Sequence, residues 1–103
     1  MRTQLVLQFQ TAGDLDSFDK LRRFEESLSS MVGQISNLDG HDFGSGEMNI
    51  FILTDDPIAT FHLVQQMEES LRPSKNMKAA YRLIEREDYV CLWPPDLDHF
   101  RVT

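Results

Sequence analysis

The sequence predicts an α+β domain in which two helices pack on one face of a mainly antiparallel sheet. Two segments with the apolar period of amphipathic helices are separated by short runs of strand-forming residues, so the predicted order is β, α, a β-hairpin, α, β and an optional extra C-terminal strand. The chain has 103 residues and an apolar share of 41%, which suits one globular domain that folds without disulfides or metals. We therefore interpret 1–103 as a single domain with a C-terminal tail at 94–103.

The first strand and the first helix are marked by a change in apolar period. Residues 4–10 read QLVLQFQ, and their alternation is typical of a half-buried strand. From 15 to 32, apolar residues recur at every third or fourth position, which places them along one face of a helix. Gly33 follows directly and provides a natural helix end.

A central strand and a second helix come next. The run NIFILT at 49–54 is almost continuously apolar, as in a strand that is covered on both faces. Asp56 is the predicted N-cap of the following helix, and Pro57 takes its first position, where a missing N–H costs little. The helical period then extends over 57–71, and Pro73 lies just beyond the predicted helix end.

The C-terminal third contains two further strand candidates, MKAAYRLIE at 77–85 and DYVCLWP at 88–94. The polar residues between them could turn a hairpin, or 78–93 could form one long strand with an irregular middle. Pro94 and Pro95 stop strand pairing. The tail after them either drapes over the sheet or is loose.

This order of elements resembles the ferredoxin-like βαββαβ sandwich over most of the chain, and the resemblance is one of fold. It also resembles small bacterial families of unassigned function, from which no catalytic motif can be carried over. The resemblance implies that the first and third strands are central, which suits the apolar runs LVL and IFIL. This architecture hosts many unrelated functions, so it implies no activity. The residues expected in the core are Leu5, Leu7, Phe9, Leu21, Phe24, Ile50, Ile52, Phe61, Val64 and Met67.

The stretch DGHDFGSGEM at 39–48 looks most like a functional site. With GSG as a hairpin turn centred on Ser45, His41 faces Asn49 and Asp39 faces Phe51 across the two strands. The two glycines of the turn would supply the positive φ angles that short hairpin loops require. A slip of one residue would send the side chains to the opposite face. The polar cluster predicted on the open face of the sheet consists of Asp39, His41, Glu47 and Asn49.

The charge distribution indicates the class of partner. The net charge is −7, from 10 basic and 17 acidic residues, which argues against nucleic-acid binding. No lysine or arginine occurs between Arg23 and Arg72, and this interval is either an ordinary solvated surface or an acidic face presented to a cationic partner. The candidate residues for binding a partner or ligand are Asp39, His41, Asp42, Glu47, Asn49, Asp55 and Asp56.

Metal binding and catalysis are weakly indicated. His41 with Asp39 or Glu47, and with His99 from the tail, could ligate zinc or iron, but no H-x-x-x-H or C-x-x-C pair fixes a geometry. Cys91 lies in a predicted strand without a basic neighbour, so we interpret it as a structural cysteine. We expect no metal and no cofactor.

Two functional hypotheses remain open. The preferred one is a non-enzymatic acidic binding protein of the inhibitor or immunity kind, directed at a basic protein. The alternative is a small enzyme, or a ligand- or metal-binding domain, with its site around His41 on the open sheet face. A homodimer through that face is also expected, because an exposed apolar patch usually meets a partner. The patch would comprise Val6, Phe51 and Leu53, with Tyr81 and Trp93 from the late strands.

The expected location is cytoplasmic, with no membrane association. No apolar run approaches the roughly 20 residues of a membrane helix. The N-terminal residues MRTQLVLQFQ lack the pattern of a signal peptide. The single cysteine, Cys91, permits no internal disulfide.

Overall fold

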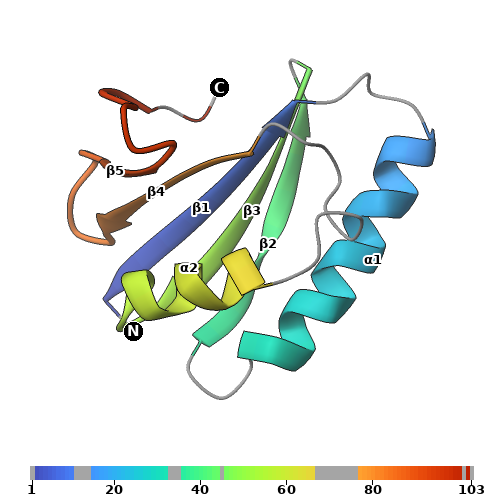
Figure 1. The fold of residues 1–103 in the computed structure, drawn as a ribbon, viewed down its shortest axis with the longest axis horizontal. Helices are drawn as coiled ribbons and strands as arrows, with labels where there is room; N and C mark the ends of the chain where they lie inside the picture. Colours follow the sequence, from blue (N-terminus) through green and yellow to red (C-terminus); the bar gives the residue numbers. More distant parts are fainter. Residues whose placement is uncertain are drawn as a thin grey trace.

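Two helices and five strands make up the described part of the computed structural model. Figure 1 shows how they are arranged. The structure describes residues 2–10, 15–32, 36–44, 46–66, 77–100 and 102, and it describes their side chains except at 15–18, 31, 32 and 36–44. The elements are β1 (Thr3–Gln10), α1 (Leu15–Val32), β2 (Ser36–Gly44), β3 (Glu47–Thr54), α2 (Pro57–Gln66), β4 (Met77–Leu83) and β5 (Val90–Trp93). The predicted strands and helices are confirmed, except that the predicted end of the second helix, 67–71, lies outside the described residues.

The strands form one antiparallel sheet in the order β2-β3-β1-β4-β5. β1 and β3 are both interior, which agrees with their apolar sequences. The last two strands pair as a hairpin, with Tyr81 opposite Val90, so the alternative of one long strand over 78–93 is wrong. The predicted class, α+β with two helices and an antiparallel sheet, is confirmed.

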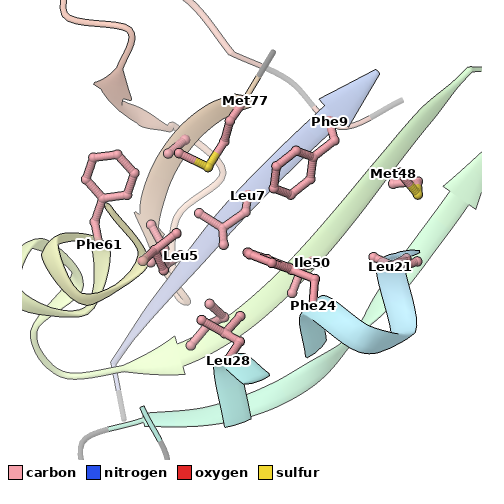
Figure 2. Packing of buried hydrophobic residues seen from close by; sticks show 13 residues of the cluster. Leu5, Leu7, Phe9, Leu21, Phe24, Leu28, Met48, Ile50, Phe61 and Met77 are labelled. Carbon is pink, nitrogen blue, oxygen red and sulfur yellow. The ribbon is translucent and has the colours of Figure 1, made fainter. Parts of the chain in front are cut away.

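Both helices contribute to one core on the same face of the sheet (Figure 2). Alternate residues of β1 point toward the helices, and the Phe9 ring meets the Phe24 ring of α1 edge-on, with centroids 5.4 Å apart. Burial of each such side chain contributes roughly 1.5–3 kcal/mol. The predicted core is confirmed for Leu5, Leu7, Phe9, Leu21, Phe24, Ile50, Ile52, Phe61 and Val64, whereas Met67 lies outside the described residues.

The junction between β3 and α2 is held by a closed set of hydrogen bonds. The Asp56 carboxylate accepts a bond from the Ala59 backbone N–H at 3.0 Å, which confirms the predicted N-cap. The Thr60 hydroxyl donates to the Asp56 carbonyl at 2.9 Å, so the Thr54 hydroxyl must donate to Thr60 Oγ1, also at 2.9 Å. The Thr54 oxygen in turn accepts the Asp56 N–H at 3.0 Å. Both buried hydroxyls are therefore satisfied, and the start of α2 is fixed on the end of β3.

The β2–β3 hairpin has a register one residue away from the predicted one. Gly44 pairs with Glu47, so the loop contains two residues and not three, and Gly46 in this loop has a φ of 74°. Short hairpin loops require such positive φ angles. His41 is consequently paired with Ile50 and not with Asn49. A register shift between Leu38 and Gly40 absorbs the residue at 39, as in a β-bulge. The predicted pairing of Asp39 with Phe51 is also wrong.

Candidate functional site

The predicted binding residues whose side chains the structure describes do not all lie together. Asp55 and Asp56 follow the end of β3, whereas Glu47 begins it, and a strand of this length separates its ends by roughly 23 Å. Asp55 is exposed and its carboxylate accepts a hydrogen bond from the Arg2 backbone N–H at 3.0 Å, while Asp56 caps α2. Among the positions on β2, Asp42 lies in register with Asn49. The side chains of Asp39, His41 and Asp42 lie outside the described residues.

Asn49 is buried and not exposed as predicted. Its side chain is 0% exposed, and its Oδ1 accepts a hydrogen bond from Gln8 Nε2 of β1 at 3.0 Å. Asn49, Gln8 and Lys78 lie in register on three neighbouring strands, so they form a polar row across the sheet face away from the helices, on which Asn49 and Gln8 are buried and Lys78 is exposed. The Nδ2 of Asn49 has no hydrogen-bond partner in the part of the chain whose side chains are described. A buried donor without a hydrogen bond lowers the stability of the fold, so a buried amide of this kind usually has a structural or functional role.

The apolar patch on the open face is smaller than predicted. Val6 is fully buried there, and Phe51 is half-buried. Tyr81 packs against the core on the helix side, where it shares a face with Ala79. The Trp93 ring lies 6.4 Å from Phe61 of α2, because an irregularity in the β4–β5 pairing places Trp93 opposite Ala79. The prediction that Tyr81 and Trp93 extend the open-face patch is therefore wrong.

A pocket lies at the end of the sheet next to the β2–β3 turn. The antiparallel order brings together the end of β1, the starts of β3 and β4, and the end of β5. The cavity has a volume of about 360 Å³, within the range of small ligand sites. The residues that line this strand-end pocket are Gln8, Gln10, Glu47, Met77, Lys78, Trp93 and Pro94.

The lining of the strand-end pocket suits recognition by charge and hydrogen bonds. Gln8 and Gln10 each offer one amide oxygen and one NH₂ group, and they lie on β1 between Glu47 and Lys78. Glu47 supplies an acceptor carboxylate and Lys78 a cationic donor. The indole of Trp93 adds a large amphipathic surface and one N–H donor. The pocket can therefore bind a polar or charged group next to an apolar one.

The described residues contain no cluster of ligands for the alternative of a metal site. No group of three or more His, Cys, Asp and Glu side chains that could hold a metal occurs among them. His99 lies on the exposed tail with its Nδ1 3.3 Å from the Asp98 carboxylate. Cys91 is half-buried on β5, opposite Ala80.

Sequence reasoning included Glu47 but missed the other residues of the strand-end pocket. One signal was available, because Gln8 occupies an interior strand whose neighbouring residues are buried and apolar. A polar side chain at such a position is unusual enough to indicate a special role. Trp93 and Lys78 could not be linked to it before the strand order was known.

No protein-family model matches the chain, and no curated protein or solved structure matches it significantly. None of the described helices is both long and apolar enough to cross a membrane. The functional assignment therefore depends on the geometry and charge of the described residues.

Proposed function

We propose that the protein is a non-enzymatic acidic binding protein that recognises a basic protein partner, in the manner of an inhibitor or an immunity protein. The observation that carries this proposal is the strand-end pocket, in which Glu47 lines the same cavity as Gln8, Gln10 and Trp93. These groups match a cationic side chain, because a carboxylate and amide oxygens accept its N–H bonds and an indole face attracts its charge.

In the proposed mode of binding, the association rate and the dissociation rate depend on different features of the protein. A net charge of −7 attracts a cationic partner over long range and raises the association rate. An arginine or lysine of the partner then enters the pocket on the Glu47 side, because Lys78 repels it from the β4 side. The buried contacts with Trp93 and the glutamine amides determine the dissociation rate.

We also propose that the architecture is a ferredoxin-like sandwich to which β5 is added as an edge strand. The order of β2, β3, β1 and β4 in the sheet and the shared core of the two helices support this assignment. The fold supplies the site but indicates no chemistry, because it carries many unrelated functions.

The test is affinity capture of partners from a lysate at low salt, followed by mass spectrometry and measurement of binding to the captured protein. Glu47→Gln should weaken binding roughly tenfold, because it removes one close charge contact. Glu26→Gln, which removes an equally acidic side chain from the exposed surface of α1, is the matched control and should have little effect. A captured partner that is not basic, or that binds Glu47→Gln as well as the wild type, would contradict the proposal.

The second candidate function is a small-molecule site, and the presence of Glu47 and Lys78 in one pocket favours it. Opposite charges on either side of two amides suit a zwitterion such as a free amino acid or a peptide end. Thermal-shift screening with amino acids and dipeptides tests this, with Lys78→Gln as the variant that should lose the response. The related idea of an enzyme or metal site around His41 predicts that His41→Ala abolishes activity or metal binding.

We retain the homodimer through the open sheet face as a proposal. Phe51 and Leu53 support it as half-buried apolar side chains of β3, although Val6 is covered. Light scattering at micromolar concentration should give the mass of two chains, and Phe51→Ser should shift it to one. A single-chain mass for the wild type would remove this proposal without affecting the partner site.

A further inference from the structure

The end of the sheet opposite the strand-end pocket gathers three chain segments that are distant in sequence. The Arg2 backbone N–H donates to the Asp55 carboxylate at 3.0 Å, and the Ile84 N–H donates to the Arg2 carbonyl at 2.9 Å. The start of β1 is thereby fixed between the end of β3 and the end of β4. In Figure 1 the first turn of α2 lies beside this same end of β1.

Exposed apolar side chains are concentrated at this end. Among the described residues, four of the five most exposed large apolar side chains lie here, namely Ile58 at 47%, Leu83 at 46%, Ile84 at 44% and Val90 at 50%. Val90 and Leu83 are close because Val90 pairs with Tyr81, two residues before Leu83. A gathering of this kind on a soluble protein usually marks an interaction surface.

Acidic side chains surround these apolar residues. Those next to them in the chain are all exposed: Asp55, Asp56, Glu85, Glu87 and Asp88. Asp98 of the tail is also exposed and lines the same end. Three arginines lie among them: Arg2 and Arg86 are exposed, whereas Arg82 is half-buried and its Nη1 donates to the carbonyls of Ile84 at 3.0 Å and Arg86 at 2.9 Å. The Arg82 guanidinium is therefore used to hold the β4–β5 connection, and the carboxylates still outnumber the arginines at this end.

A groove between the β4–β5 connection and the C-terminal tail completes this end. It has a volume of about 720 Å³, and its apolar lining includes Ile84, Tyr89, Phe100 and Val102. The rings of Tyr89 and Phe100 meet edge-on with centroids 5.1 Å apart. The groove is also lined by four carboxylates, two arginines and a histidine: Glu85, Glu87, Asp88, Asp98, Arg82, Arg86 and His99. An apolar anchor can therefore enter the groove while basic groups beside it reach carboxylates.

We propose that this acidic apolar end, defined by Ile58, Leu83, Ile84, Val90 and the surrounding carboxylates, docks a basic amphipathic segment of the partner protein. The proposal rests on the proposed function and adds a second, larger contact surface to it. Charge complementarity decides the occupant. A second copy of this chain would bring the same excess of carboxylates over arginines against itself, whereas a segment that alternates basic and apolar residues satisfies both the carboxylates and the apolar surface.

The test uses synthetic fluorescent peptides of about 12 residues, long enough to cross this end when extended at roughly 3.3 Å per residue. One peptide alternates lysine and leucine, and its matched control carries glutamine in place of lysine. Binding is measured by anisotropy to the wild type and to two charge variants, Glu87→Gln with Asp88→Asn and, on α1, Asp19→Asn with Glu26→Gln. Both variants lose two exposed carboxylates, so they have the same net charge. Val90→Ser with Ile84→Ser tests the apolar part.

The lysine–leucine peptide should bind, and the variant at 87 and 88 should weaken it roughly tenfold while the α1 variant changes it less than about twofold. The serine variant should weaken binding roughly fivefold at unchanged charge, as expected for lost apolar contacts. Equal effects of the two charge variants, or no effect of the serine variant, would overturn the inference, because binding would then follow net charge alone.

A captured basic partner whose binding depends on Glu47 but not on this end would also overturn it, and would leave the proposed function intact. Partner binding that depends on this end but not on Glu47 would support the inference and contradict the proposed role of the strand-end pocket.

Discussion

The two ends of the sheet differ in shape and lining, so the proposed contacts with a cationic partner differ as well. The strand-end pocket is a cavity of about 360 Å³ in which Glu47 is accompanied by amides and an indole. The acidic apolar end is broader and more exposed, with carboxylates around apolar side chains. The pocket suits one side chain, whereas the acidic apolar end suits a segment of chain. If the proposed partner binds both ends, we expect the pocket to determine specificity and the acidic apolar end to raise the association rate.

Both ends depend on the same core, so the largest effect should come from Ile52→Asp. Ile52 is 0% exposed in the core, and a buried unpaired carboxylate costs several kcal/mol. We expect the variant to be unfolded by circular dichroism and to lose binding at both ends. Leu53→Asp is the matched control, because Leu53 is the next residue, half-buried on the opposite face. A folded Ile52→Asp variant would contradict the packing described here.

Substitutions at the Gln8–Asn49 pair should change the free energy of unfolding and the binding of the partner to different extents. Asn49→Leu should lower the free energy of unfolding by about 1–3 kcal/mol, because it removes the buried hydrogen bond from Gln8 Nε2 to Asn49 Oδ1. The double variant Gln8→Leu with Asn49→Leu should recover part of this loss and still bind weakly, since Gln8 lines the pocket. Urea unfolding and partner binding measured on the same samples check both statements. If the double variant binds the partner as well as the wild type does, the pair has only a structural role.

The N-cap of α2 should produce a smaller effect confined to the acidic apolar end. Asp56→Ala removes the bond to the Ala59 N–H and should cost about 1 kcal/mol. Asp56→Asn keeps an equivalent cap while removing the charge, so it should be almost as stable as the wild type. Thermal unfolding distinguishes the two substitutions. An equal loss of stability in both would mean that the charge of Asp56, and not its capping bond, stabilises the start of the helix.

The sequence was sufficient for features that depend on local patterns. The helix over 15–32, the Asp56 cap and the strand of alternating residues before Gln10 are each set by neighbours in the chain. The register of the β2–β3 hairpin was missed because a two-residue loop and a bulge near Asp39 together shift the pairing. Neither is visible in the alternation of side chains.

The site was less predictable because it is assembled from strand ends. Glu47 could be selected from its acidic surroundings, but Gln8 and Trp93 join it only through the order of the sheet. Asp55 and Glu47 both belong to the sequence interval without basic residues, and this suggested that they lie close together. The length of β3 separates them. The carboxylates at Glu87 and Asp88 lie outside that interval, yet they share the acidic apolar end with Asp55.

Backbone hydrogen exchange of the protein, alone and with a captured basic partner, is the decisive test of binding at both ends of the sheet. We expect slower exchange in the complex around Gln10 and Glu47 at one end and around Ile84 and Val90 at the other. Exchange along the exposed face of α1, near Glu26, should not change. Protection on α1 with no change at either end would rule out this mode of binding, because the partner would then bind a surface that neither the strand-end pocket nor the acidic apolar end includes.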